Sequence, residues 1–245
     1  MPNLIRFGTG GRGASISAPI IGEDFNWTGG DGTYQVLDDG GGNWRIKFLS
    51  SGTFTPLKNM VVDAFLVGAG GGKSKVLCGG GGSGYTTTVR SVVLTANTVY
   101  SIVVGAAGKN GNDNNLLGTK GGTTSAFAAS ALGGEASKRG YTSSKEPGAD
   151  GGSGGGGLNT SGVHGTNSTA TGGTDGSDGT TADTAGGAGQ GTTTREFGEA
   201  DGDLYASGGG DNLSITVPNS GNGGAYNIEP ANGIVVIRQH KEVAA

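Results

Sequence analysis

Apolar and polar residues alternate along several short stretches of this chain, which is the pattern of half-buried β-strands. The clearest stretch is 44–49, where Trp44, Ile46 and Phe48 share one face and the intervening basic residues the other. Residues 61–67 are apolar on both faces and predict a central, covered strand, and residues 233–238 predict a closing strand. No window of a dozen residues carries a helical stripe, so we expect an all-β fold.

Two further stretches, 85–94 and 99–104, are separated by only four residues and predict a β-hairpin. Weaker strand candidates are 34–37, 53–55, 124–128, 204–206 and 213–217. Many short strands without helices are typical of β-sandwiches and jelly rolls. We therefore expect a β-sandwich or jelly-roll-like core.

Glycine changes this picture, because it supplies 56 of the 245 residues, against a usual share of about 7%. Strand-like residues run directly into glycine at 65–72, 102–108, 130–134 and 204–210. We therefore expect glycine-rich segments to extend from one end of the sandwich. The formal net charge of −4 and the β-branched segments between the runs favour an ordered chain over a disordered one.

In some of these glycine-rich segments a small residue recurs at every third position, which is the period of the polyproline-II helix. The positions are Gly148, Gly151, Gly154 and Gly157, then Gly173, Gly176 and Gly179, continued by Ala182, Ala185 and Ala188. Such helices have no internal hydrogen bonds, so their backbone groups can bond laterally to neighbours. We expect a polyglycine-II helix bundle over about 148–232; the alternative is a chance match in glycine-rich sequence.

The first residues differ from the rest, because residues 1–31 mix large apolar side chains with glycine and show no clear period. We divide the chain into an N-terminal docking or oligomerisation segment, 1–31, and a glycine-rich β domain, 32–245. The alternative for the first segment is an additional edge strand of the same sandwich.

Several segments resemble the glycine-rich domains of bacteriophage tail and virion appendage proteins: 61–72, 79–87, 189–198, 204–210 and 233–238. A looser likeness exists to the tip adhesins of T-even-like phage long tail fibres and to the glycine-rich domain of the anaplastic lymphoma kinase receptor family, whose cysteines this chain lacks. The resemblance implies a non-enzymatic tail-fibre or tip adhesin that binds a host-surface receptor. A purely structural decoration or fibre protein is the alternative, and an ice-binding protein a remote one.

The same resemblance implies the partners. Residues 1–31 would contact other virion or tail proteins, the receptor would be a host-surface glycan or outer protein, and the chain would form a homo-oligomer, with a trimer favoured. We expect it in the virion, assembled in the host cytoplasm and released by lysis. With 16 basic and 20 acidic residues, there is no charge signature for nucleic acid, and no apolar run is long enough for membrane insertion.

Receptor binding is expected in the polar inserts between glycine runs, at 109–117, 138–147, 158–171, 211–219 and 225–230, because loops on a rigid scaffold commonly carry binding. From these inserts we select Tyr141, His164, Asn167 and Tyr226 as receptor-binding residues. The alternative is that the inserts are ordinary polar turns.

Two segments resemble enzymatic sequence motifs but lack a residue or the flanking elements that those motifs require. Residues 68–74 resemble a phosphate-binding loop, but the required first glycine is Val67. Residues 151–155 match the nucleophile-elbow pattern without a preceding strand or a following helix. The four aspartates at 175, 178, 201 and 203 form no full calcium-loop signature. We therefore expect no catalytic residue, no cofactor and no metal site, and the single cysteine, Cys78, precludes an internal disulfide.

Overall fold

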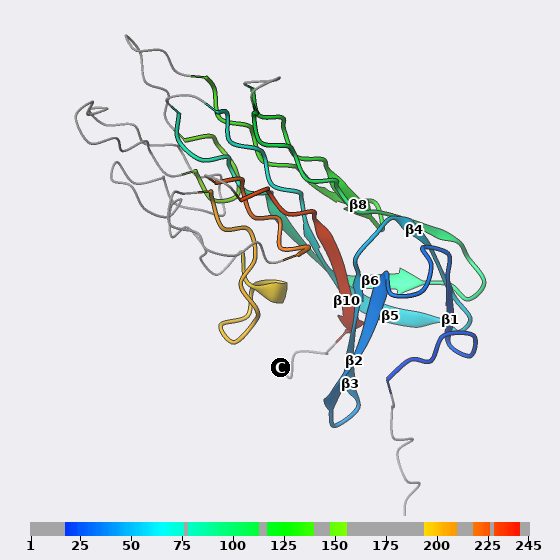
Figure 1. Ribbon diagram of the computed structural model, residues 1–245. Helices are drawn as coiled ribbons and strands as arrows, with labels where there is room; N and C mark the ends of the chain where they lie inside the picture. Colours follow the sequence, from blue (N-terminus) through cyan, green and yellow to red (C-terminus); the bar gives the residue numbers. More distant parts are fainter. Residues whose placement is uncertain are drawn as a thin grey trace, which may run out of the picture.

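Two five-stranded antiparallel sheets form one half of the molecule, and glycine-rich runs form the other (Figure 1). The structure is a computed structural model that describes residues 18–75, 78–112, 117–139, 148–155, 194–209, 218–225 and 228–240. These residues contain no α-helix. Accordingly, they include no helix of the length and apolarity needed to span a membrane. The all-β, sandwich-like expectation is confirmed.

The strands of each sheet come from distant parts of the chain. Sheet 1 has the order β1 (Phe25–Trp27), β4 (Gly52–Pro56), β7 (Tyr100–Val103), β8 (Thr124–Ala126) and β9 (Ala129–Ala131). Sheet 2 has the order β2 (Tyr34–Gly40), β3 (Asn43–Phe48), β10 (Ile234–Gln239), β5 (Met60–Val67) and β6 (Thr86–Leu94).

Sheet 2 explains why the central strands are apolar on both faces. The C-terminal strand β10 lies between β3 and β5, so that Ile237 is paired with Ile46 on one side and with Ala64 on the other. From Val62 to Val67, β5 is buried at every position, as the sequence predicted. One of its faces contacts sheet 1 and the other contacts the segment 194–206.

The core between the sheets is rich in aromatic rings. Trp27 and Phe48 have ring centroids 4.7 Å apart, and Phe54 lies 5.4 Å from Phe25 and 5.5 Å from Phe48. Phe25 and Trp27 belong to β1, so this part of the N-terminal segment is an edge strand of sheet 1. Residues 1–17, the first part of the expected docking segment, lie outside the described residues.

The predicted hairpin between 85–94 and 99–104 is wrong. The strands β6 and β7 exist, but β6 pairs with β5 in sheet 2, whereas β7 pairs with β4 and β8 in sheet 1. The intervening turn carries the chain from one sheet to the other, with Asn97 at φ 62° donating its backbone N–H to Pro56. The doubly covered β5 needs a neighbour on each side, and β6 fills that place.

Other strand predictions differ in detail. The stretch 124–128 ends as a strand at Ala126, because Phe127 and Ala128 form a turn with positive φ and lead into β9. Residues 204–206 contain an isolated bridge between Leu204 and Arg195 rather than a strand. Residues 213–217 lie outside the described residues. The short strand β1 corresponds to the edge strand that was the alternative for residues 1–31, and β9 overlaps the strand-like residues that begin the stretch 130–134.

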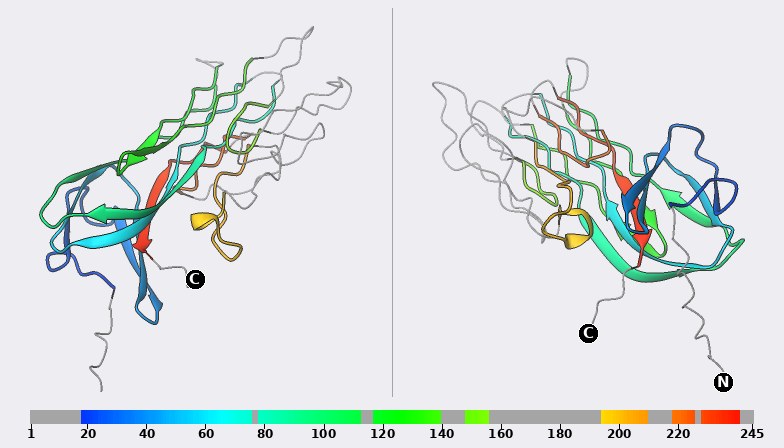
Figure 2. Two further views of the ribbon diagram at one scale, coloured as in Figure 1. Left: turned by 180° about the vertical axis from the view of Figure 1, so that it is seen from behind. Right: turned by 90° about the horizontal axis from the view of Figure 1, so that it is seen from below.

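The glycine-rich runs leave the sheets at one end and lie side by side (Figures 1 and 2). We call this assembly the glycine bundle. It comprises the runs 68–73, 79–85, 105–111, 118–122, 132–137, 149–155, 206–209, 220–224 and 228–233, which are joined by backbone hydrogen bonds. Several of these runs precede residue 148, where we had expected the glycine helices to begin.

Candidate functional site

The run 68–73 lies at the centre of the glycine bundle and donates hydrogen bonds in a three-residue rotation. The N–H groups of residues 68 to 70 point to three different neighbouring runs, and those of Gly71 and Gly72 return to the first two of these runs. The N–H of Lys73 donates to the side chain of Asn110 instead. The bonded pairs, donor first, are Gly68–Tyr85 and Gly71–Gly82 with one run, Ala69–Gly122 and Gly72–Thr119 with a second, and Gly70–Ala231 with a third.

The carbonyl groups of this central run accept bonds with the same rotation from three further runs. The pairs, donor first, are Gly134–Ala69 and Ser137–Gly72, Gly108–Gly70 and Gly111–Lys73, and Gly224–Gly71. The central run thus has six bonded neighbours. Its peptide groups bond to these other runs and not to one another.

Such close packing leaves no room for side chains. A Cβ atom added to Gly70 would lie 1.8 Å from the carbonyl oxygen of Asn222, and one added to Gly68 would lie 1.9 Å from that of Leu132. Both obstacles are backbone atoms, which a side-chain rotation cannot move. Ala69 is the only non-glycine residue between 68 and 72, and it is fully buried.

A second feature covers the outer face of sheet 2, where the segment 194–206 packs on β5 and β10. Phe197 of the 3-10 helix η2 (Glu196–Gly198) and Tyr205 lie against Phe65, with ring centroids 6.0 and 5.5 Å from it. Phe65, Val236 and Ile234 form an apolar cluster with them. This packing fixes the segment over the sheet.

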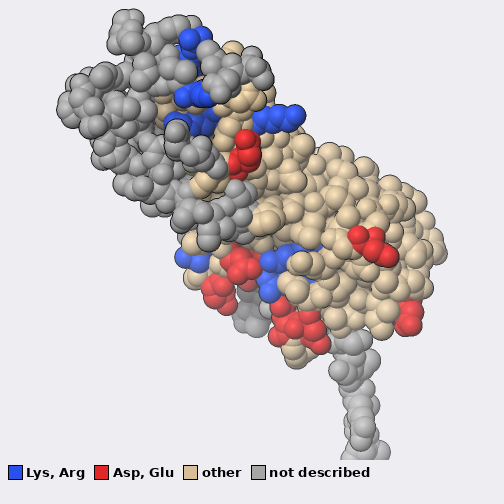
Figure 3. Space-filling model, viewed as in Figure 1, with Lys and Arg blue, Asp and Glu red and all other residues tan. Residues whose placement is uncertain are grey.

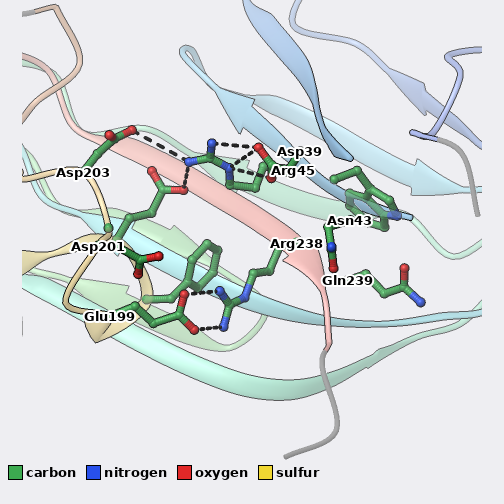
Figure 4. A pocket seen from close by; sticks show the side chains of 12 residues that line it. Asp39, Asn43, Arg45, Glu199, Asp201, Asp203, Arg238 and Gln239 are labelled. Carbon is green, nitrogen blue, oxygen red and sulfur yellow. Dashed lines mark hydrogen bonds and ion pairs between the residues drawn. The ribbon is translucent and has the colours of Figure 1, made fainter. Parts of the chain in front are cut away.

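A polar cavity of about 210 Å³ opens between this segment and strands β2, β3 and β10 (Figure 4). Its central carboxylate is Glu196, which is 2% exposed. Glu196 accepts hydrogen bonds from Arg45 at 2.6 Å and from the Tyr205 hydroxyl at 3.0 Å, and it lies 3.3 Å from the ammonium of Lys47. Burial and the charge of Glu196 raise the pKa of Tyr205 to about 12.

A second buried carboxylate, Asp63, lies where the register of β5 shifts against β6. It is 3.3 Å from Arg238 and 3.0 Å from Arg90, and the His240 ring nitrogen lies 2.6 Å away. Burial would raise the pKa of Asp63, but the His240 hydrogen bond, the Ser91 N–H and the charge of Arg238 hold it below its usual 3.8.

These ion pairs connect the covering segment to the sheet. Arg238 also donates two hydrogen bonds of 2.6 Å to Glu199, and its guanidinium stacks 4.2 Å from the Phe197 ring centroid. Removing one partner of such a buried pair leaves an uncompensated charge. The cavity in Figure 4 is therefore lined largely by groups that bind one another, an arrangement suited to holding the fold.

The residues of the apparent enzymatic motifs are buried in the glycine bundle. Lys73 is 7% exposed, and its ammonium donates to the carbonyl groups of Cys78 at 2.5 Å and Gly79 at 3.4 Å. Ser153 is fully buried, and its backbone N–H donates to the hydroxyl of Ser83. Within the described ranges, no group of three His, Cys, Asp or Glu residues is placed to hold a metal ion.

The four residues predicted to bind a receptor, Tyr141, His164, Asn167 and Tyr226, all lie outside the described residues. Their roles therefore stay predictions. Sequence reasoning missed the two buried ion clusters. One usable signal was present: Asp63 and Arg238 each interrupt an otherwise apolar strand, and a charge in a covered strand needs a partner.

Comparison with known proteins gives one positive finding. The sequence model of a family described as a glycine-rich domain matches residues 48–236. The match includes β4 to β9, the segment 194–206 and the first half of β10. No curated protein matches the chain.

Proposed function

The chain belongs to the glycine-rich domain family, and we propose that it is a non-enzymatic virion appendage protein of a bacteriophage, a tail-fibre or tip subunit that binds a host-surface receptor. The single observation that carries the proposal is the central run 68–73 with its six bonded neighbours. A protein that must hold binding loops away from a particle needs a scaffold of this kind, because loops on a rigid scaffold commonly carry binding.

We propose that the glycine bundle is a polyglycine-II helix bundle. Three features support this: the bonds are lateral, their direction rotates with a three-residue period, and added Cβ atoms would collide with neighbouring backbone. We likewise propose a jelly-roll-like core. The chain crosses repeatedly between the sheets, at β1–β2, β3–β4, β4–β5, β6–β7 and β9–β10, which supports that arrangement.

The bundle suits an exposed appendage for a physical reason. Proteolysis requires local opening of the chain, and opening a central run would break lateral bonds to several neighbours at once. Described runs of the bundle end at Asn112, Arg139 and Gly155. The polar inserts that follow these points in the sequence are the receptor-binding elements of the proposal.

The test is binding of the labelled full chain to a panel of bacterial cells and cell-envelope fractions. A variant with residues 158–171 replaced by Gly and Ser tests the inserts, and Thr95→Ser/Ala96→Ser, at the turn between β6 and β7, is the control. Saturable, strain-selective binding that only the insert variant loses supports the proposal. A folded protein that binds no strain favours a structural decoration protein instead.

We further propose that the N-terminal segment docks on another virion protein or on further copies of the chain, with a trimer favoured. The test must remove residues 1–17 alone, because a longer deletion would take Phe25 and Trp27 out of the core. The deletion variant should fold normally and lose its oligomeric state or carrier binding in sedimentation experiments. Unchanged assembly would contradict the docking role.

A further inference from the structure

A serine, a histidine and an aspartate meet on the outer face of sheet 2, on β5, β6 and the residue that follows β10. The Ser91 hydroxyl lies 3.1 Å from Nε2 of His240, and Nδ1 of the same ring lies 2.6 Å from Oδ1 of Asp63. Asp63 is fully buried, whereas Ser91 is exposed and the His240 side chain is 21% exposed. A hydroxyl bonded to an imidazole that is bonded to a buried carboxylate is the arrangement of a serine nucleophile, which is recognised by geometry and not by sequence position.

The backbone fixes the positions of these three residues. The register of β6 shifts against β5, so that two residues, Arg90 and Ser91, lie opposite Asp63. Ser91 takes φ 56° there, a left-handed conformation that is uncommon for a residue other than glycine. The backbone N–H of His240 donates to the Val61 carbonyl at 2.9 Å, which ties the histidine to β5. Irregularities of this kind in a sheet re-aim side chains and are common next to active sites.

The two oxygen atoms of the Asp63 carboxylate have separate partners. Oδ2 accepts hydrogen bonds from Arg90 at 3.0 Å and from Arg238 at 3.3 Å. Oδ1 accepts the Ser91 N–H at 3.1 Å and faces the His240 ring. Since the folded pKa of Asp63 lies below 3.8, the group is ionised at neutral pH and can only accept hydrogen bonds. The proton of the neutral His240 ring is therefore assigned to Nδ1, and the lone pair of Nε2 is left to accept the Ser91 hydroxyl.

The surroundings of the hydroxyl suit the other parts of an ester. Val61 and Val93 are paired across β5 and β6 beside the site and are 40% and 70% exposed, so they offer an apolar surface to a short acyl chain. Arg90 has five N–H donors, of which the Asp63 carboxylate and the Phe197 carbonyl take two, and a further one can stabilise a developing oxyanion. Figure 3 shows acidic and basic side chains gathered near the C-terminal end of β10, so the apolar surface has a charged border.

We propose that Ser91 is a nucleophile that hydrolyses esters of short aliphatic acids, with His240 as the general base and Asp63 as a positioning residue. Nε2 of His240 takes the hydroxyl proton while Oγ of Ser91 forms a bond to the ester carbonyl carbon. The bond from this carbon to the leaving alcohol oxygen then breaks, and His240 gives the proton to that oxygen. Water then gives a proton to His240 and its oxygen bonds to the acyl carbon, and Ser91 leaves with the proton. In sum, ester and water become acid and alcohol.

The experiment treats the full chain with p-nitrophenyl acetate and, separately, with a fluorophosphonate, which transfers its phosphonyl group to a serine oxygen with loss of fluoride. The expected result is release of nitrophenol, with an acetyl or a phosphonyl group located on Ser91 by mass spectrometry. His240→Ala should lower the rate of acetylation at least about 100-fold, and added imidazole should restore part of that rate. No label on Ser91 in the unaltered chain overturns the inference.

Matched variants separate the chemistry from the fold. Ser91→Gly removes the hydroxyl and accommodates the positive φ, so it should fold normally and lose both the label and the esterase activity. Ser101→Ala removes an exposed hydroxyl from β7 in sheet 1 and should react like the parent protein. Equal rates of ester hydrolysis in the parent protein and Ser91→Gly, or in the parent protein and His240→Ala, would assign these residues to the fold alone.

The role of Asp63 needs a signal that a purely structural role would not change. Nitrogen NMR of the His240 ring reports which of its two nitrogen atoms carries the proton. We expect the proton on Nδ1 in the parent protein and a shift of it towards Nε2 in Asp63→Asn, whose amide group can donate to Nδ1. A proton on Nε2 in the folded parent protein contradicts the positioning role, whether or not the variant folds.

This inference goes beyond the proposed function and alters one part of it, the absence of catalysis, while receptor binding does not depend on it. If the unaltered chain binds cells but Ser91 takes no label, the ester site is overturned and receptor binding stands. If Ser91 is labelled in a His240-dependent way but no cells are bound, the ester site stands and the receptor function fails.

Discussion

The six-neighbour packing of residues 68–73 predicts that a single methyl group will destabilise the protein strongly. In Gly70→Ala the new Cβ would lie 1.8 Å from the Asn222 carbonyl oxygen, whereas a comfortable carbon–oxygen contact is about 3.3–3.6 Å. The two runs must therefore separate by about 1.5 Å. Lateral bonds beside the contact, such as Gly224 to Gly71 at 2.8 Å, would then exceed hydrogen-bond distance.

The magnitude follows from the number of bonds lost. A broken lateral bond that leaves one of its two buried groups unpaired costs about 1–3 kcal/mol, so losing two such bonds costs about 2–6 kcal/mol. For a chain of this size we expect the melting temperature to fall by roughly 5–20 °C. Thermal unfolding followed by circular dichroism, with urea denaturation beside it, measures both quantities.

Two controls separate collision from other effects of glycine. Gly32→Ala lies in open space at φ +75° and should cost only the left-handed backbone penalty, about 1–2 kcal/mol. Ala69→Gly, in the same central run, should cost about 1 kcal/mol through added backbone freedom. If Gly70→Ala is no less stable than Gly32→Ala, the packing argument is refuted.

Three further substitutions test the clusters around sheet 2 and the bundle junction. Asp63→Asn leaves Arg238 poorly compensated and should lower the free energy of unfolding by about 3–5 kcal/mol in urea at neutral pH. The folded pKa of Asp63 lies below 3.8, so its contribution to stability is present above pH 3.8 and is lost as pH falls through that folded pKa. The stability of the variant should therefore depend less on pH in acid than that of the parent protein. Tyr205→Phe should lower the free energy of unfolding by about 1–2 kcal/mol. The pKa of Tyr205 is about 12 in the folded protein against an ordinary 10.0, so the parent protein should lose stability as pH rises from 10.0 to about 12. If alkaline denaturation shows no such loss, the assignment is contradicted. Thr124→Val removes the hydroxyl that accepts the Gly105 N–H and donates to Val67. The free energy of unfolding should fall by about 1–3 kcal/mol, and the Gly105 amide should exchange faster with solvent. An amide that stays as protected as in the parent protein would contradict this prediction.

The sequence predicted those strands whose side chains carry the pattern themselves. Alternation placed Trp44, Ile46 and Phe48 on one buried face, and the doubly apolar stretch 61–67 became the covered strand β5. Short strands were predicted less sharply: β1 and β9 have three residues each, too few to show a clear alternation, and their bounds were not predicted. The hairpin prediction failed because proximity in sequence favoured pairing β6 with β7, while burial of β5 required β6 elsewhere.

The candidate site was less predictable, for two different reasons. Arg45 and Glu196 are 151 residues apart, and nothing local to either residue names its partner. Glycine gives even less information about its partner, because a residue without a side chain does not indicate in the sequence which run it will contact. The three-residue period was found only at 148 and beyond, although lateral bonding begins at Gly68, where the runs are too short to show a period.

The partners of each glycine run are nevertheless set by the sheets from which the runs emerge. The pairing of Val67 with Thr86 in sheet 2 continues, in the same antiparallel register, as Gly68–Tyr85 and Gly71–Gly82 in the bundle. The pairing of Val67 with Ile234 continues as Gly70–Ala231. In sheet 1, β7–β8 and β8–β9 likewise continue as Gly122–Ala106 and Gly121–Gly134.

What the bundle adds is bonding between the two sheets. Ala69, which follows β5 of sheet 2, donates to Gly122 and accepts from Gly134, and these two residues flank β8 and β9 of sheet 1. In the sandwich the two sheets meet only through side chains, whereas in the bundle their extensions share backbone hydrogen bonds. Side chains hold the two sheets apart, whereas the glycine runs that continue their strands have no side chains and can pack close enough to share backbone hydrogen bonds. The register fixed by the hydrophobic strands therefore specifies a lattice that the glycines alone could not encode.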